Sequence, residues 1–443
     1  MKKPGKKWWL IALAVVAVAA AAVLILTLGK GKESPAAQGT KAGFTPGLDP
    51  KTECSITVVG HYDNFEALEA EFIRFNQYYP NVRLTYVKMD GYDKRDRGIL
   101  STALAGSEAP DIFFTYPKMA DWPDNAAILA ASENLADPAL GIDLSCVRES
   151  LLKKEADGSV LSVPIYTTTY GMLVNEDIFA KEKIAVPQTY TELLSACDAL
   201  KKAGYANPVM GYNRGNGVLY PLFYPYFCAQ IKGNETALND LNSMKPEAGE
   251  YMRAALALES DFMAHGYIDL EKCNELEKDY DPVILRFFEG DVPMMTTTGN
   301  TVSGTEKRQS KSEAFTAHPF KYSFYPMPST EEGGYFVNEI SLGFGVNKNS
   351  KNLKMVNEFM RFLVSTGELN EMAKAKRLVT PCVDMSLDSM YVAFGKLDAQ
   401  RIINLAELGL QNDPAGQVNR AGKRVSDGTL TVDEAVAAFG SIE

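Results

Sequence analysis

Histidine and the short motifs of common catalytic centres are scarce in this chain. Three histidines occur in 443 residues, at His61, His265 and His318, too few and too scattered for a zinc-binding HExxH helix. There is no GxSxG segment, the mark of a nucleophile elbow. Gly416–Lys423 resembles a phosphate-binding loop, but its glycines are one residue too far apart and Arg424 stands where that motif needs Ser or Thr. We therefore expect no metal and no cofactor, although paired carboxylates could still form a glycoside hydrolase site.

Cysteine pairs with the spacing of metal ligands are also absent. No two of the six cysteines are separated by two residues, so the sequence offers neither a zinc-ribbon site nor a thioredoxin-like motif. Disulfide bonds formed outside the cell and buried free thiols are both compatible with this spacing. The six positions, whose pairing the sequence leaves open, are Cys54, Cys146, Cys197, Cys228, Cys273 and Cys382.

Positive charge is scarce outside the N-terminus. The formal net charge is −11, and because the first 30 residues contain five lysines and no acid, the rest of the chain carries −16. A phosphate backbone would be repelled by such a surface, so we expect no nucleic-acid partner. Apolar residues make up 46% of the chain, and at this length they predict two packed domains instead of disorder.

The N-terminus has the pattern of a membrane segment. Residues 8–28 contain no charge and one polar side chain, Thr27, and about 20 such residues span a bilayer as a helix. The run is longer than the roughly 7–15 apolar residues of a signal peptide, which favours an uncleaved anchor while leaving a signal peptide open. The lysines before the run should stay inside the cell and the body outside it. We predict an anchor or signal peptide over residues 1–30 and a flexible linker over residues 31–51.

The first part of the body alternates between strand and helix patterns. Short β-branched or apolar runs predict strands, and apolar residues three and four apart predict helices between them. Such a succession is typical of an open, largely parallel sheet, in which ligands lie beyond the carboxyl ends of the strands. The predicted elements are the strands Ser55–Gly60, Val82–Tyr86 and Ile112–Phe114 and the helices 65–79 and Ile99–Ala105.

A second α/β run follows from about residue 171. Thr189 and Glu192 have the spacing of a capping box, which predicts the start of a helix over Thr189–Lys202. Thr431 and Glu434 repeat this spacing before a terminal helix. The other elements that we predict are strands over Met172–Val174, Pro293–Met295, Tyr322–Tyr325 and Leu342–Val346 and a helix over Val356–Val364.

Five segments, taken in order, resemble one family. They are Leu104–Phe114, Val163–Phe179, Val186–Tyr205, Phe287–Gly299 and Val425–Phe439. Each is weak alone, but their order and spacing are similar to those of the extracellular solute-binding proteins that serve ABC importers, in the branch of maltose-binding protein and other sugar binders.

The resemblance implies an α/β, two-lobed fold with a hinge and a central cleft. Lobe 1 would comprise residues 52–165 completed by 335–375, and lobe 2 residues 166–334 completed by 376–443. The implied function is non-catalytic capture of a small solute, with a mono- or oligosaccharide as the expected ligand and importer permease subunits as partners at the outer face of the membrane. A ligand-sensing module for a membrane receptor remains an alternative, and a glycoside hydrolase is a further one.

Candidate ligand contacts in the first lobe directly follow the first strand. They are His61, Tyr62, Asp63 and Asn64, where the carboxyl end of a strand would border the cleft. Sugar sites combine flat apolar faces with groups that hydrogen-bond hydroxyls, and these side chains supply both. The alternative is that Asp63 or Asn64 only caps the following helix.

The remaining candidates lie at the crossing segments and in the second lobe. Tyr116 follows the third strand, while Tyr166 and Tyr170 flank the segment that would cross between lobes. The resemblance places Tyr220 and Tyr224 in an aromatic segment of the second lobe, and we expect Tyr224 to be an exposed cleft residue. Two further candidates, placed by the turns beside them, are Asn300 and Glu339.

Overall fold

The computed structural model describes residues 43–91, 98–116, 126–213, 215–276 and 280–442. Residues 46–443 cluster as one compact unit, which contains two β-sheets. The predicted membrane segment over residues 8–28 lies outside the described residues. Within the described part of the chain, no helix combines the length and the apolar character needed to cross a membrane.

The first sheet has six strands in the order β10-β9-β3-β1-β2, and β4 also pairs with β9. β1 lies parallel to β2 and to β3, which confirms the predicted strand and helix alternation at the start of the body. β9 runs antiparallel to β3 and to β4, so the sheet is mixed. The strands are β1 (Cys54–Gly60), β2 (Val82–Lys88), β3 (Ile112–Thr115), β4 (Val163–Thr168), β9 (Phe336–Val346) and β10 (Ile402–Asn404).

The second sheet has four strands in the order β6-β7-β5-β8. β5 is antiparallel to β7 and to β8, whereas β6 is parallel to β7. Both central strands are buried, as their methionine and valine side chains require. The strands are β5 (Tyr170–Asn175), β6 (Val209–Gly211), β7 (Met294–Thr298) and β8 (Tyr322–Tyr325).

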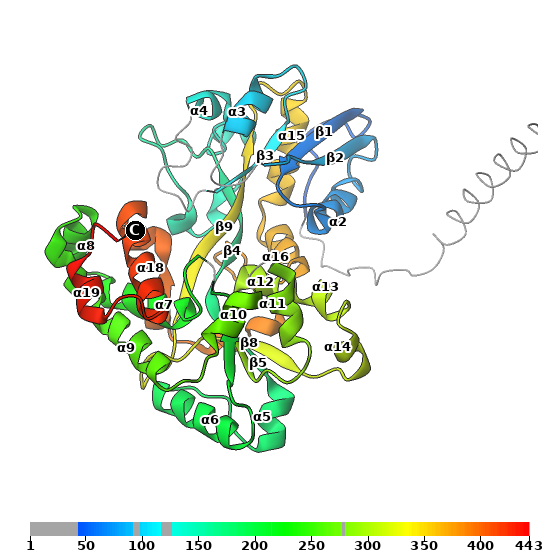
Figure 1. Cartoon of the computed structure of the whole chain (residues 1–443). Helices are drawn as coiled ribbons and strands as arrows, with labels where there is room; N and C mark the ends of the chain where they lie inside the picture. Colours follow the sequence, from blue (N-terminus) through cyan, green and yellow to red (C-terminus); the bar gives the residue numbers. More distant parts are fainter. Residues whose placement is uncertain (1–42, 92–97, 117–125, 214, 277–279, 443) are drawn as a thin grey trace, which may run out of the picture. The chain divides into compact units, whose positions relative to one another are not determined.

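Strand β9 is the longest in the described chain and connects two cores (Figure 1). Residues 339–344 of β9 pair with β4, and residues 343–346 pair with β3. At its start, Phe336 and Val337 pack instead into two hydrophobic clusters of the second half of the body. The predicted strand Leu342–Val346 is therefore only the end of a longer strand, because the polar residues Asn338 and Glu339 interrupt the apolar pattern that marks it.

The helices around the first sheet include two that cover it with strongly apolar faces. α2 places Leu68 and Phe72 in the core and ends at Phe75, earlier than Pro80 suggests, because the chain turns through residues 76–79. α15 packs against α2. The helices of this part are α2 (Glu66–Phe75), α3 (Gly98–Ala105), α4 (Ala126–Ala131), α15 (Leu353–Leu363), α16 (Thr366–Ala375) and the 3-10 turns η1 (Pro138–Leu140), η2 (Leu144–Cys146) and η3 (Glu149–Leu151).

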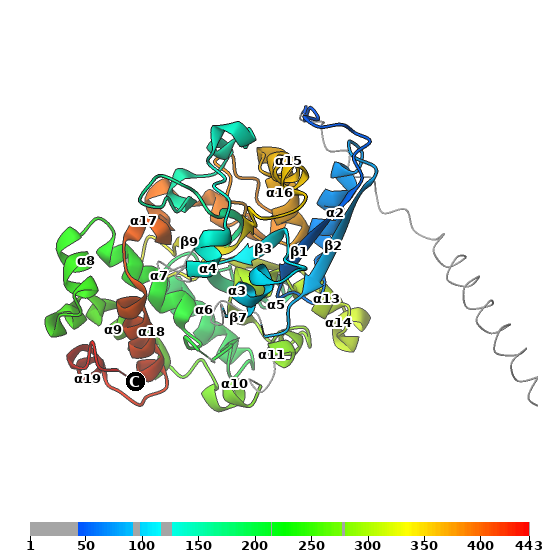
Figure 2. The ribbon, with the colours of Figure 1, turned by 90° about the horizontal axis from the view of Figure 1, so that it is seen from above.

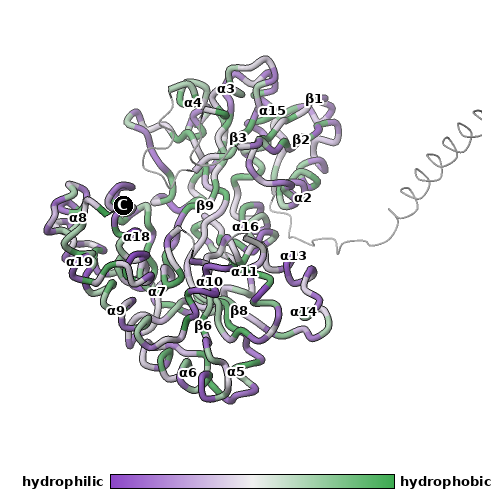
Figure 3. Tube along the Cα trace, in the orientation of Figure 1, coloured by the Kyte–Doolittle hydropathy of each residue, from purple (hydrophilic) through white to green (hydrophobic). Residues whose placement is uncertain are grey.

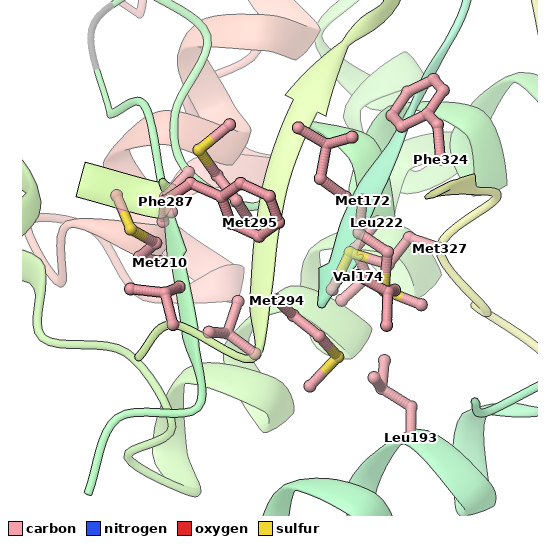
Figure 4. Packing of buried hydrophobic residues seen from close by; sticks show 14 of the residues in the cluster. Met172, Val174, Leu193, Met210, Leu222, Phe287, Met294, Met295, Phe324 and Met327 are labelled. Carbon is pink, nitrogen blue, oxygen red and sulfur yellow. The ribbon is translucent and has the colours of Figure 1, made fainter. Parts of the chain in front are cut away.

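The helices around the second sheet enclose a methionine-rich core. Met172, Met294 and Met295 come from its central strands, and Leu193 of α6 closes the core from one side (Figure 4). The predicted capping box of Thr189 and Glu192 is present at the start of α6. These helices are α5 (Glu176–Glu182), α6 (Tyr190–Lys202), α10 (Leu270–Leu276), α11 (Tyr280–Phe287), α12 (Gly299–Val302), α13 (Thr305–Gln309), α14 (Glu313–Ala317), η5 (Ser389–Tyr391), η6 (Phe394–Lys396) and η7 (Ala399–Arg401).

A third group of helices packs beside both sheets. α7, α9 and α18 contact one another, which the two views of the ribbon also show (Figures 1 and 2). Figure 3 shows hydrophobic residues gathered around β6 and β8, in contrast to hydrophilic α13. The third group consists of α7 (Tyr220–Ile231), α8 (Glu235–Asn242), η4 (Pro246–Met252), α9 (Arg253–Ala264), α17 (Leu405–Leu408), α18 (Asn412–Ser426) and α19 (Val432–Ala437).

Candidate functional site

A cavity of about 600 Å³ opens between the third helix group and the long strand β9. Its volume lies within the range of roughly 300–1,000 Å³ that is usual for small-molecule sites. Elements far apart in sequence form its walls, as ligand sites between packed substructures commonly do. The lining residues are Ser150–Lys153 at η3, Tyr170 of β5, Asn216, Tyr220 and Tyr224 of α7, Glu339 and Ile340 of β9, and Leu405, Ala406, Leu408–Asn412, Ala415, Gly416 and Asn419 around α17 and α18.

Three tyrosines form an aromatic wall of this cavity. Tyr220 and Tyr224 lie one helical turn apart on α7, so their rings meet on one face. The rings are stacked, with centroids 4.7 Å apart and planes inclined by 15°. Tyr170 presents its ring edge to Tyr220 at a centroid distance of 4.8 Å. The pairs stiffen each other and offer a flat apolar surface together with hydroxyl groups.

Two of the tyrosine hydroxyls, those of Tyr220 and Tyr170, form a chain of hydrogen bonds that ends at a carboxylate, whereas the Tyr224 hydroxyl makes a hydrogen bond with the Cys228 thiol. The Tyr220 hydroxyl donates to the Tyr170 oxygen, and the Tyr170 hydroxyl donates to Glu339 Oε2. Burial raises the pKa of all three tyrosines well above its ordinary value, so their hydroxyls are neutral. The cavity wall therefore presents neutral phenols aligned by one carboxylate.

Asn419, another residue of the cavity lining, has an amide oxygen without a hydrogen-bond partner in the described structure. Asn419 Oδ1, on α18, is buried and makes no hydrogen bond within the described structure. A buried acceptor without a donor costs about 1–3 kcal/mol. Other amides on this wall come from Asn216, Gln411 and Asn412. The cavity thus pairs an aromatic face with neutral polar groups.

Most of the polar lining was not among the residues predicted from the sequence. Residues 405–419 contribute Gln411, Asn412 and Asn419, yet they match no motif. The sequence contains one local signal of a helix break here, Gly409 followed by Pro414. In the structure Gly409 adopts a left-handed conformation after α17, and Pro414 lies in the first turn of α18. Such a break between helices favours a loop that can border a site, but it does not indicate which strand or helix lies opposite.

Four predicted site residues come together in the cavity lining: Tyr170, Tyr220, Tyr224 and Glu339. The prediction that Tyr224 is an exposed cleft residue is wrong, because its side chain is 5% exposed. Tyr220 on one side and Phe227 on the other cover it, at centroid distances of 4.7 Å and 6.2 Å. The same run of aromatic residues in a sequence is compatible with the surface of a cleft and with a buried core.

The residues after β1 form a separate cluster. His61 Nδ1 lies in hydrogen-bonding distance, 2.6 Å, of the Tyr116 hydroxyl. The rings of Tyr62 and Phe114 are in a T-shaped arrangement with centroids 5.3 Å apart, and Lys376 Nζ lies over the Tyr62 ring, 5.0 Å from its centroid. His61, Tyr62 and Tyr116 follow the carboxyl ends of β1 and β3, as predicted, but they are not part of the cavity lining described above.

Asp63 and Asn64 are exposed at the surface beside this cluster. Asp63 forms an ion pair of 2.7 Å with Lys88, and this hydrogen bond lowers the pKa of Asp63. The alternative that either residue caps α2 is wrong, since Phe65 occupies the cap position and no side chain bonds there.

The last two candidates lie apart from the cavity lining. Tyr166 is fully buried in β4, and its hydroxyl has no hydrogen-bond partner in the described structure. Asn300 is exposed on α12 and accepts a 2.8 Å hydrogen bond from Ser341. Burial on both faces of β4 explains why Tyr166 faces a core.

The described residues contain no group of three or more His, Cys, Asp or Glu side chains that could hold a metal ion. The cavity wall carries two ionisable groups with opposite charges, Lys153 and Glu339, beside its neutral tyrosines. Its chemistry suits the holding of a small, largely uncharged molecule through stacking and hydrogen bonds.

Comparison with known proteins identifies the family. The family model described as "Bacterial extracellular solute-binding protein" matches residues 60–369, well over half of the chain. No curated protein matches the sequence.

Solved structures with the same fold are distant in sequence. One is the solute-binding protein RafE in complex with raffinose, 16% identical, which covers 87% of this chain and 98% of its own with a TM-score of 0.64; another structure is of apo RafE from Streptococcus pneumoniae. A chitin oligosaccharide binding protein is 17% identical over 87% of this chain and 97% of its own, with a TM-score of 0.64. The GacH receptor of Streptomyces glaucescens is 18% identical over 88% and 97%, with a TM-score of 0.62. At these identities the likeness establishes the fold, an α/β architecture of two sheets with flanking helices.

Proposed function

The chain belongs to the bacterial extracellular solute-binding protein family, and from that premise we propose that it captures a carbohydrate in the cavity beside Tyr220 and Tyr224. Family membership implies a location outside the cytoplasm. The bound sugar would then be delivered to the permease subunits of an ABC importer. Similar structures include a complex with raffinose and a chitin oligosaccharide binding protein, which supports this ligand class.

The observation that carries this proposal is that stacked tyrosines and several amide side chains line one cavity. A sugar ring has an apolar face of C–H groups and a rim of hydroxyls. The side chains of Tyr220 and Tyr224 line the cavity and provide apolar contact for the first, and the amides of Asn216 and Asn419 line it and provide hydrogen-bonding groups for the second. Neutral polyols match both features at once.

The charge of the cavity wall argues against strongly charged ligands. A polyamine or a phosphate needs several protein groups of the opposite charge, because desolvating an unpaired charge is costly. The wall instead carries one cation, Lys153, and one anion, Glu339. Glu339 can accept hydrogen bonds from sugar hydroxyls, and Lys153 can donate hydrogen bonds to them.

Binding without bond cleavage is the activity that we propose. Glycoside hydrolysis uses two carboxyl groups on either side of the scissile bond. Among the described residues of the cavity wall, Glu339 is the carboxylate, and the Tyr170 hydroxyl occupies one of its oxygens. That arrangement favours holding a sugar in place over transferring a proton to it.

We also propose how the protein is arranged at the membrane. Residues 8–28 would anchor it and residues 31–51 would act as a flexible tether. Lobe 1 would comprise residues 52–165 with 335–375, and lobe 2 residues 166–334 with 376–443. The two would close over the ligand by bending of the segments that cross between them, which presents a distinct closed form to the importer.

The test is thermal unfolding of the full chain against a panel of sugars, amino acids, peptides and polyamines. A ligand at 100 times its dissociation constant adds about 2.7 kcal/mol to the stability of the folded state. We expect a rise in the unfolding midpoint with one class of mono- or oligosaccharide, and recovery of that sugar unchanged. A rise with charged ligands alone would overturn the carbohydrate proposal, and conversion of the sugar would overturn non-catalytic binding.

A further inference from the structure

Two cysteines far apart in sequence lie on neighbouring strands of backbone. Cys146 ends the 3-10 turn η2, and Cys382 follows α16 and is fully buried. An antiparallel bridge pairs Val147 directly with Cys382. Opposite residues in such a pair have Cα atoms about 4.5–5.5 Å apart, so Cys146, the next residue along, is within the reach of a disulfide bond.

Backbone hydrogen bonds hold the two segments together on both sides of the cysteines. The amide of Val383 donates to the carbonyl of Cys146 at 2.9 Å, and the amide of Arg148 donates to the carbonyl of Pro381 at 3.0 Å. The partly buried guanidinium of Arg148 donates further hydrogen bonds to the carbonyls of Thr380 and Pro381. The register is thus fixed by several independent contacts.

The two thiols face each other. Interaction between the two thiols raises the pKa of Cys146 and lowers that of Cys382, and the Cys382 sulfur also lies 3.9 Å from the carbonyl oxygen of Thr366. Three other cysteines occupy buried positions on helices of the second half of the body: Cys197 on α6, Cys228 on α7 and Cys273 on α10.

We propose that Cys146 and Cys382 form a disulfide bond in the exported protein. The proposal rests on the location outside the cytoplasm that family membership implies, where disulfides form and persist. It does not depend on the identity of the ligand. The other four cysteines, including Cys54 at the start of β1, remain thiols.

The bond forms by two thiol–disulfide exchanges with the disulfide of an exported thiol oxidoreductase. A Cys382 thiolate attacks one sulfur of the oxidant, which forms a mixed disulfide and releases one oxidant thiol. The Cys146 thiolate then attacks the Cys382 sulfur and releases the second oxidant thiol. Two electrons pass to the oxidant, and the two protons lost by the cysteines end on its thiols.

The bond would link the segment that leads into the cavity wall to the segment that pairs with β4. Ser150–Lys153, a few residues after Cys146, line the cavity. On the other side, Val379 bridges Thr167 of β4. A covalent link at this point closes a chain loop of more than 200 residues, and long closed loops constrain the unfolded state most.

Peptide mapping of the exported full-length protein tests the proposal. Free thiols are blocked with iodoacetamide in denaturant without reductant, and the protein is then digested and analysed by mass spectrometry. We expect a cross-linked peptide pair containing Cys146 and Cys382, which separates after reduction, and blocked thiols at the other four positions. Blocking of Cys146 or Cys382 without reduction, or a link from either to another cysteine, overturns the proposal.

A second measurement compares unfolding midpoints. The double variant Cys146→Ser and Cys382→Ser should unfold about 5 °C lower than the oxidised protein. Reductant should lower the midpoint of the parent and leave that of the double variant unchanged. Cys54→Ser serves as the control, since its midpoint should still fall when reductant is added. An equal response of the parent and the double variant to reductant would contradict the bond.

Discussion

The two groups of candidate ligand contacts differ in how the chain brings them together. The first group, His61 to Asn64 with Tyr116, follows neighbouring strands and is close in space because β1 pairs with β3. The second group unites Tyr170, Tyr220, Tyr224 and Glu339 from β5, α7 and β9, and it lines a cavity. Strand order alone predicts the first group, whereas the second depends on tertiary packing.

The difference shows that position after a strand is weak evidence for a ligand contact. Asp63 and Asn64 occupy the expected place and are exposed. Tyr224 occupies an unremarkable helical position and lies in the wall of the cavity. We make four predictions, in order of decreasing expected effect. Three of them compare the two groups, and one concerns a buried carboxyl group behind the tyrosine helix α7.

Tyr224→Ala should have the largest effect. The side chain is 5% exposed and stacks on Tyr220, so its loss should lower the free energy of unfolding by about 3–5 kcal/mol. Tyr62→Ala, in the first group, should cost only about 1 kcal/mol, because that ring is half-buried. Urea unfolding of both variants measures the difference, and equal losses would remove the contrast between the groups.

Glu259→Gln should change how stability depends on pH. Glu259 lies fully buried on α9, behind the tyrosine helix α7, and neither of its carboxyl oxygens has a hydrogen-bond partner in the described structure. Burial raises its pKa well above the ordinary value. Its contribution to stability is therefore present below the unfolded pKa and is lost as pH rises towards the folded pKa, at about 1.4 kcal/mol per pH unit.

The Gln variant lacks this loss because its side chain stays neutral. Relative to the parent, it should gain roughly 2–3 kcal/mol in the free energy of unfolding between pH 5 and pH 7. Urea unfolding at both pH values measures the gain. Parallel pH profiles for parent and variant would show that Glu259 is ionised in the folded protein.

Asn419→Ala should weaken sugar binding with little change in stability. Its Oδ1 atom has no partner in the described structure, so the variant loses a hydrogen bond only when ligand is bound, about 0.5–1.5 kcal/mol or roughly 2–10-fold in affinity. Asn64→Ala is the matched control, an exposed amide in the first group that should leave affinity unchanged. Calorimetric titration distinguishes the groups, and the reverse ranking would place the site after β1.

Asp63→Asn should have the smallest effect. The carboxylate is exposed and paired with Lys88 at the surface, where ion pairs contribute little. We expect neither the unfolding midpoint nor the affinity for sugar to change beyond measurement error. A clear loss of affinity would indicate that the first group, after all, holds the ligand.

The sequence predicts well those strands and helix starts that depend on neighbouring residues. The strands β1 to β3 and the capping boxes at Thr189 and Thr431 depend on neighbouring residues, and the structure contains them. Strand β9 was predicted too short, since Asn338 and Glu339 are buried polar residues that interrupt the apolar pattern of the strand. Hydrogen bonds to residues far away in the sequence satisfy their polar groups. A short stretch of sequence does not reveal such contacts.

The candidate site was predictable only in part for the same reason. Four aromatic or acidic residues of the cavity wall were identified, although burial of Tyr224 was not. The polar residues of 405–419 were missed because no motif marks them and their role depends on packing against β9. Seven other candidates lie outside the cavity lining, as a position at the end of a strand does not decide which cavity a side chain borders.

Hydrogen exchange with and without a bound sugar tests the central claim most directly. Amides in Ser150–Lys153, α7 and residues 405–419 should exchange more slowly in the sugar-bound protein, because these segments line the cavity. That result would support carbohydrate capture beside the stacked tyrosines. Slower exchange confined to residues 61–64, with no change around the cavity, would contradict it and locate the ligand after β1.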